Sequence, residues 1–125
     1  MSHIMAVLLN DLAELEYDRD QPLPDYQAVY LDRMDARMDT GIRIGEESII
    51  NPDRNQRAQF VAANLVHAIK RNDEPLAAAL CSYLAVRQPD LRQVRIRDDA
   101  GEVTIELVYD EDYRKQVAVP FTPLH

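Results

Sequence analysis

The leading candidate for a catalytic residue in this chain is a histidine. His67 lies well inside the sequence, near the end of an expected helix and beside Leu65 and Ile69. Because the charge of histidine changes near neutral pH, His67 could act as a general acid or base. The alternative is a partly buried histidine at the end of a helix, which is the interpretation we favour. His67 is therefore kept as the one catalytic candidate.

The single cysteine, Cys81, could be a nucleophile if His67 lay beside it, since the thiolate is the reactive form. Cys81 follows Leu80 in an alanine-rich stretch, where a cysteine is more often a small core residue. One cysteine allows no intramolecular disulfide, which favours a reducing compartment. The chain has neither HxxxH nor CxxC spacing, and its three glycines form no phosphate loop. We expect no metal and no cofactor.

Two arginines and two tyrosines are candidate binding residues. Arg95 and Arg97 alternate with apolar residues, so they should share the outer face of a strand and could hold a phosphate or an acidic partner. Glutamates expected on the neighbouring strand favour a purely structural role for both. Tyr109 and Tyr113 could belong to a contact surface, as tyrosine does in many interfaces. The same two alternatives, contact surface or edge of the core, apply to the pair Tyr26 and Tyr30.

The formal net charge of −8 is placed unevenly along the sequence. Residues 1–53 contain 4 Lys/Arg and 12 Asp/Glu, whereas residues 54–125 contain 10 of each. An acidic surface repels phosphate backbones, so direct binding of nucleic acid is disfavoured. The acidity could suit the basic surface of another protein, or it could simply keep the protein soluble.

Residues 1–50 are expected to form an acidic, mainly helical part. Apolar residues at helical spacing predict a first helix over residues 4–15. Residues 17–25 contain two prolines and read as a connector. A second helix over residues 26–38 should carry Tyr26, Val29, Tyr30, Arg33, Met34 and Met38 on one face, with Asp32, Asp35 and Asp39 elsewhere, and Asp25 could cap it. Gly41 should end this helix, and residues 42–44 alternate like a short strand.

Residues 51–89 predict a helical hairpin. Asn51 and Pro52 are a typical helix start, and the apolar spacing continues to about Lys70 and Arg71. Asp73 should cap the next helix, which has Pro75 in its first turn. That helix should end at Gln88, because the residue before proline is disfavoured in the helical conformation.

Residues 92–120 predict an antiparallel β-meander, because the apolar period changes to two. A turn over residues 98–101 would place Arg97 opposite Glu102, and Ile96 opposite Val103. A second turn over residues 110–114 would lead to a last strand that ends at Pro120.

The sequence thus predicts a single α+β domain over residues 1–125. The helical hairpin and the N-terminal helices should pack on one face of an antiparallel meander of three or four strands. The longest apolar runs are far shorter than the roughly 20 residues of a membrane span, and we expect a cytoplasmic protein. We also expect a homodimer, because a meander leaves open edges.

Three functions remain open at this point. The absence of a catalytic motif favours a small non-enzymatic interaction module, an accessory, assembly or regulatory protein that acts through protein–protein contacts. The first alternative is a small enzyme of unrecognised type that uses His67 with nearby carboxylates and tyrosines. The second is an acidic protein that binds a basic surface of a nucleic-acid-binding partner.

Overall fold

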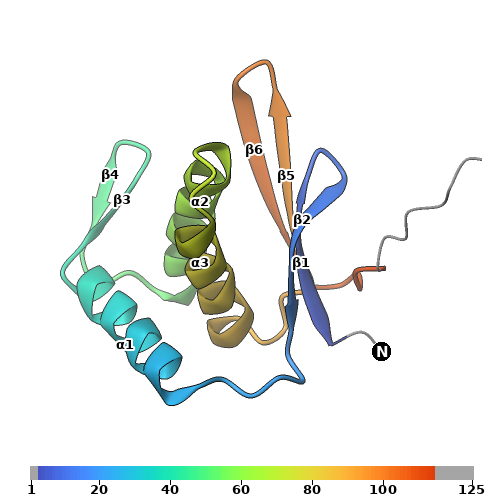
Figure 1. Ribbon diagram of the computed structural model, residues 1–125. Coiled ribbons are helices and arrows are strands. Elements are labelled where there is room, and N and C mark those ends of the chain that lie inside the picture. The colour runs from blue at the N-terminus through green and yellow to red at the C-terminus, as the bar shows by residue number, and fades with distance from the viewer. Residues whose placement is uncertain (1–2, 115–125) are drawn as a thin grey trace, which may run out of the picture.

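The chain begins with a β-hairpin. The computed structural model describes residues 3–114, and its first elements are β1 (Ile4–Leu9) and β2 (Leu12–Asp18), joined by a two-residue turn (Figure 1). Asn10 and Asp11 form this turn at φ 49° and 69°, a left-handed conformation that these two residue types tolerate and that hairpin turns require. The helix predicted over residues 4–15 is therefore wrong.

The hydrophobic pattern of β1 explains why it is a strand. Residues 5–8 are all buried, so this strand is covered on both faces. A continuous apolar run is typical of such a central strand, and it also satisfies helical spacing. In β2 the pattern alternates instead, with Ala13, Leu15 and Tyr17 half-buried and the residues between them exposed.

The main sheet is mixed rather than antiparallel throughout. Its order is β2-β1-β5-β6, where β5 is Gln93–Asp99 and β6 is Glu102–Val108. β1 and β5 pair in parallel, and both hairpins are antiparallel. The predicted β5–β6 hairpin is thus present, but its inner neighbour is β1 from the other end of the chain. The predicted last strand, which continues to Pro120, lies outside the described residues.

The turn between β5 and β6 is tighter than expected. Asp99 pairs with Glu102, so Ala100 and Gly101 alone form the turn, at φ 53° and 89°. The four-residue turn predicted over residues 98–101 is wrong, and the register moves by two residues, which places Arg97 opposite Thr104. A shift of two leaves every side chain on its predicted face, because strand side chains alternate with a period of two.

Replacing Ala100 by asparagine should raise the free energy of unfolding by about 0.5–1 kcal/mol. Alanine adopts a left-handed conformation at a cost, whereas asparagine before glycine is favoured in such turns. Urea denaturation measures the change. Gly101→Ala is the opposite control and should lower stability, since its φ of 89° strains an L-residue. An unchanged midpoint for Ala100→Asn would contradict the proposed strain.

Two antiparallel helices cover one face of the sheet. α2 (Arg54–Lys70) and α3 (Glu74–Arg87) confirm the predicted hairpin (Figure 1). The start of α2 differs from the prediction, because Asp53 is its N-cap and forms a capping box with Gln56. Asn51 lies before this cap in a left-handed conformation (φ 52°). The predicted cap of α3 is confirmed, since the Asp73 side chain accepts the backbone N–H of Leu76.

A third layer lies on the far side of the helical hairpin from the sheet (Figure 1). It consists of α1 (Asp25–Asp39) and a small hairpin of β3 (Ile42–Ile44) and β4 (Glu47–Ile49), which confirms the predicted strand over residues 42–44. Gly41 ends α1 at φ 134°. Asp25 does not cap this helix, because Pro24 occupies the N-cap position and no side chain bonds there.

One hydrophobic cluster joins all three layers. Leu31 of α1, Leu65 of α2, Leu84 of α3 and Val94 of β5 are fully buried members of it. A smaller cluster, with Tyr113, lies on the other face of the sheet. Within residues 3–114, no helix is long and apolar enough to cross a membrane.

Candidate interaction groove

A cluster of charged side chains fixes how α1 lies on the helical hairpin. Its centre is Asp35, whose carboxylate accepts hydrogen bonds from Tyr83 Oη (2.5 Å), Arg57 Nη1 (3.2 Å) and Arg87 Nε (2.9 Å). Two neighbouring aspartates extend the cluster, since Asp32 pairs with Arg87 at 2.6 Å and Asp39 with Arg57 at 2.5 Å. The C-terminal half of α1 is therefore tied to α2 through Arg57 and to α3 through Tyr83 and Arg87.

The electrostatics of this Asp35 cluster favour the charged carboxylate. Burial alone would raise the pKa of Asp35, but the hydrogen bonds from Tyr83, Arg87 and Arg57 outweigh it, and the pKa is lowered. Burial, with the Asp35 carboxylate second, raises the pKa of Tyr83, which stays a protonated donor. Asp35 is thus a charged acceptor at neutral pH.

The Asp35 cluster also decides which face of α1 is exposed. Leu31, Asp35 and Met38 face the helical hairpin. Tyr26, Val29 and Tyr30 consequently face outward, with 73%, 49% and 43% of their surface exposed. The helical face that the sequence predicts combines these three residues with Met38, but Met38 is buried whereas the three are exposed. Of the two interpretations of Tyr26 and Tyr30, the exposed contact surface agrees with the structure better than the edge of the core.

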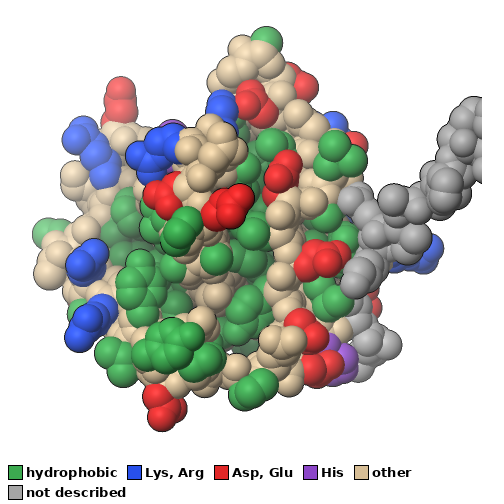
Figure 2. Space-filling view, viewed as in Figure 1, with side chains coloured by type: hydrophobic (Ala, Val, Ile, Leu, Met, Phe, Trp, Pro, Cys, Tyr) green, Lys and Arg blue, Asp and Glu red, His purple; other side chains and the backbone are tan. Residues whose placement is uncertain are grey.

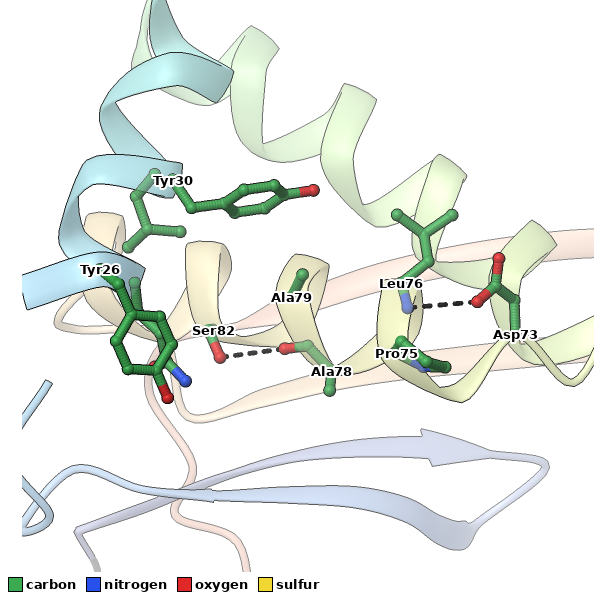
Figure 3. Close-up of a pocket in the computed structure, with 10 residues that line it drawn as sticks. Tyr26, Tyr30, Asp73, Pro75, Leu76, Ala78, Ala79 and Ser82 are labelled. Carbon is green, nitrogen blue, oxygen red and sulfur yellow. Dashed lines mark hydrogen bonds between the residues drawn. The ribbon is translucent and has the colours of Figure 1, made fainter. Parts of the chain in front are cut away.

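An apolar groove lies between the N-terminal half of α1 and α3. Its volume is about 590 Å³. Tyr26 and Tyr30 reach into it from α1, and small side chains of α3, Ala78, Ala79 and Ser82, form its floor (Figure 3). The remaining lining residues are Gln27, Leu31, Asp73, Pro75 and Leu76. Hydrophobic side chains gather over α1 and α3 on this face of the molecule, and both acidic and basic side chains border them (Figure 2). We call this feature the α1–α3 groove.

A second hollow, of about 370 Å³, lies on the other side of α3, toward β2. It shares Asp73 and Ala78 with the α1–α3 groove, and its other acidic lining residues are Glu14 and Glu74. The exposed ridge of α3 at Ala78 therefore separates two adjacent hollows. Both have acidic residues near the N-terminus of α3.

The histidine and cysteine candidates are not brought together. His67 is exposed on α2 and lines none of the hollows described here. Cys81 is buried in α3, and burial raises the pKa of its thiol to about 12, so it is protonated at neutral pH. No group of three His, Cys, Asp or Glu side chains within residues 3–114 is placed to hold a metal ion.

The four binding candidates are engaged in bonds within the protein. Arg95 pairs with Glu111 at 3.0 Å, and Arg97 donates to both carboxylate oxygens of Asp11 at 3.0 and 3.1 Å. Both arginines line a hollow of about 240 Å³ on the outer face of the sheet. Their guanidinium groups are therefore already paired with carboxylates. The expected pairing of Arg97 with Glu102 is wrong.

The two tyrosine candidates line no described hollow together with those arginines, although Glu111, the partner of Arg95, lines the same hollow as Tyr113. Tyr109 is 38% exposed and donates to Gln88 Oε1 at 3.2 Å. Tyr113 is buried and donates to Glu16 Oε2 at 2.6 Å. None of the described hollows is lined by both an arginine candidate and a tyrosine candidate from this set. The candidates therefore form no common site.

The N-terminal acidic residues do not form one continuous face. Asp11 lies at the tip of the β1–β2 hairpin, whereas Asp32, Asp35 and Asp39 lie on α1 and neutralise Arg57 and Arg87. Much of the charge imbalance between the two parts of the sequence is thus used inside the protein. This arrangement gives no support to the alternative of an acidic protein that binds a basic surface of a nucleic-acid-binding partner.

Comparison of the chain with protein-family models, with curated proteins and with solved structures finds no match. The arguments about function therefore rest on the geometry described above.

Proposed function

We propose that the protein is a non-enzymatic interaction module whose α1–α3 groove binds an apolar segment of a partner protein. The observation that carries this proposal is the exposure of Tyr26, Val29 and Tyr30 beside an open apolar groove. Exposed apolar side chains that gather next to a groove commonly mark an interaction site, and tyrosine is enriched in interface cores.

The rigid attachment of α1 supports this proposal. The Asp35 cluster holds one wall of the groove in place before any partner arrives, so binding need not order that helix. The enzyme alternative has less support, because the exposed His67 shares no described hollow with a carboxylate and a tyrosine. The buried free thiol of Cys81 is compatible with the cytoplasmic location that we propose.

Ala79→Gln should abolish partner binding without unfolding the protein. Glutamine fills the groove floor with a longer polar side chain, and it is a good helix former. The test is affinity capture from the source cell by the wild-type chain and by this variant, followed by binding measurements with the purified captured protein. We expect the dissociation constant to rise about tenfold or more, the equivalent of about 1.4 kcal/mol.

Ala63→Gln is the matched control, because Ala63 is an exposed alanine of α2 outside the groove. It should bind the partner as the wild type does. Equal binding by the wild type, Ala79→Gln and Ala63→Gln would overturn the proposed function. Light scattering of the same three proteins tests whether the partner is a second copy, since a homodimer through this groove would dissociate only in Ala79→Gln.

A further inference from the structure

We infer that the α1–α3 groove takes an amphipathic helical segment that carries lysine or arginine beside its apolar residues. This inference rests on the proposed function and deepens it by naming the chemistry of the partner. Three features of the groove lead to it: the carboxylates at its rim, the shape of its floor and the helical backbone of its walls.

Carboxylates lie at the groove and beside it in the sequence. Asp73 is the one charged residue among the described residues that line the groove. Glu74 follows it on α3, and Asp25 precedes Tyr26 on α1. In the part of the chain that the structure describes, none of these three carboxylates forms an ion pair, whereas Asp32, Asp35 and Asp39 on the same α1 are paired with arginines.

The dipole of α3 reduces this negative charge without cancelling it. The N-terminus of a helix carries about half a positive elementary charge, which stabilises the carboxylates of Asp73 and Glu74. Two carboxylates against about half a charge leave a net negative field at this end of the groove. A cationic side chain at the edge of a bound segment would therefore be attracted, and an anionic one repelled.

The floor of the groove suits a helix. Pro75, Ala78, Ala79 and Ser82 follow one another at the i, i+3, i+4 and i+7 positions of α3, and the last three have small side chains. Small residues let a neighbouring helix approach closely, since interaxial distance depends on the side chains at the contact. Tyr26 and Tyr30 would then cover the bound segment from α1 (Figure 3).

The walls of the groove disfavour an extended peptide. Both are helices, whose interior N–H and C=O groups are already bonded within the helix. An extended segment would find no backbone partners along them and would leave its own polar groups unpaired where water is excluded. A helical segment satisfies these groups internally, and helices bind in grooves through apolar anchors at similar spacing.

The test uses three synthetic peptides and fluorescence anisotropy. The first has leucine at helical spacing with lysine elsewhere, the second replaces lysine by glutamate, and the third has the composition of the first in scrambled order. We expect the Leu/Lys helix to bind the wild-type chain at least about tenfold more tightly than either other peptide, and Ala79→Gln to lose most of this binding.

Asp73→Asn isolates the charge, because asparagine caps helices as well as aspartate does. It should weaken Leu/Lys binding several-fold and reduce its dependence on salt. Glu102→Gln is the matched control, since it removes one exposed carboxylate at the turn of β5 and β6 and should leave binding unchanged.

The outcomes separate this inference from the proposed function. If the Leu/Glu helix binds as tightly as the Leu/Lys helix and Ala79→Gln weakens both, the groove is a binding site but the prediction of a basic partner is wrong. Equal binding of the scrambled peptide would overturn the helical segment. Loss of the captured partner from Ala79→Gln, combined with no binding of any peptide, would also overturn the inference while the proposed function survives.

Discussion

Replacing Arg19 by methionine should lower the free energy of unfolding by about 3 kcal/mol. Arg19 follows β2, and its guanidinium donates to three backbone carbonyls, those of Ala85 (3.2 Å), Gln88 (3.0 Å) and Leu91 (2.6 Å). These carbonyls lie at the end of α3 and in the loop that leads to β5. A hydrogen bond to a charged group contributes about 1.5–3 kcal/mol, and these three share one side chain, so they do not add fully.

The reason for so large an effect is that one side chain bonds three carbonyls, that of Ala85 in the last turn of α3 and those of Gln88 and Leu91 just beyond it. The last carbonyls of a helix have no partner within the helix, and Gln88 and Leu91 are buried, so water cannot easily take the place of the guanidinium. The same contacts tie the β1–β2 hairpin to α3 across the sequence. Loss of Arg19 should therefore loosen the groove floor as well as the global fold.

Urea denaturation followed by circular dichroism measures this effect. Arg33→Met is the matched control, because Arg33 is an exposed arginine of α1, and its replacement should change stability by less than about 0.5 kcal/mol. Arg19→Lys should fall between the two, since an ammonium group cannot reach three carbonyls as a guanidinium fork does. Equal urea denaturation midpoints for Arg19→Met and Arg33→Met would contradict the proposed role of Arg19 at the end of α3.

Local signals account for the parts of the fold that could be predicted. The helical hairpin was predictable because the residues that begin and end its helices are adjacent to them in the sequence: Asp73 caps α3, and Pro89 follows its last residues. The β5–β6 hairpin was predictable because its apolar residues alternate. Even the error of two residues in its turn kept each side chain on the right face.

The N-terminal β-hairpin could not be predicted from the same kind of signal. The apolar run of β1 is compatible with both a helix and a buried strand, and the deciding partner is β5, which lies nearly the whole chain away. The Asn10–Asp11 turn was the one local signal for a hairpin. Apolar residues at helical spacing continue through this turn, and that spacing favoured the prediction of a helix.

The α1–α3 groove could be predicted only in part, again because the deciding contacts are distant in the sequence. Tyr26 and Tyr30 could be recognised as candidates for a contact surface, but the rotation of α1 decides whether they are buried. That rotation depends on Asp35, whose partners Arg57 and Arg87 lie on other helices. Helical periodicity alone leaves both interpretations of the tyrosines open, because it does not reveal that the half-buried Asp35 has bonded partners on other helices.

Asp35→Asn should lower the free energy of unfolding by about 2 kcal/mol at neutral pH. The amide keeps the shape of the side chain and can still accept from Tyr83, but it leaves Arg57 and Arg87 without their central anion. The effect is smaller than for a fully buried pair, because 29% of the Asp35 side chain is exposed and water screens its charge.

The pH dependence has a definite sign. The folded pKa of Asp35 is lowered, so its carboxylate stabilises the protein above the unfolded pKa of about 3.9, and this stability is lost as pH falls through the folded pKa. The difference in stability between wild type and Asp35→Asn should therefore be constant near neutral pH and shrink as the pH falls below about 4. Urea denaturation at several pH values between neutral and strongly acidic conditions measures it.

Glu46→Gln is the control, because Glu46 is an exposed carboxylate between β3 and β4 that forms no ion pair among the described residues. It should leave stability nearly unchanged at every pH. The readout that links Asp35 to function is binding of the Leu/Lys helix, which Asp35→Asn should weaken although Asp35 does not line the groove. A stability difference that persists undiminished at acid pH would show that the carboxylate charge is not what holds α1 in place, and the outward rotation of Tyr26 and Tyr30 would then need another cause.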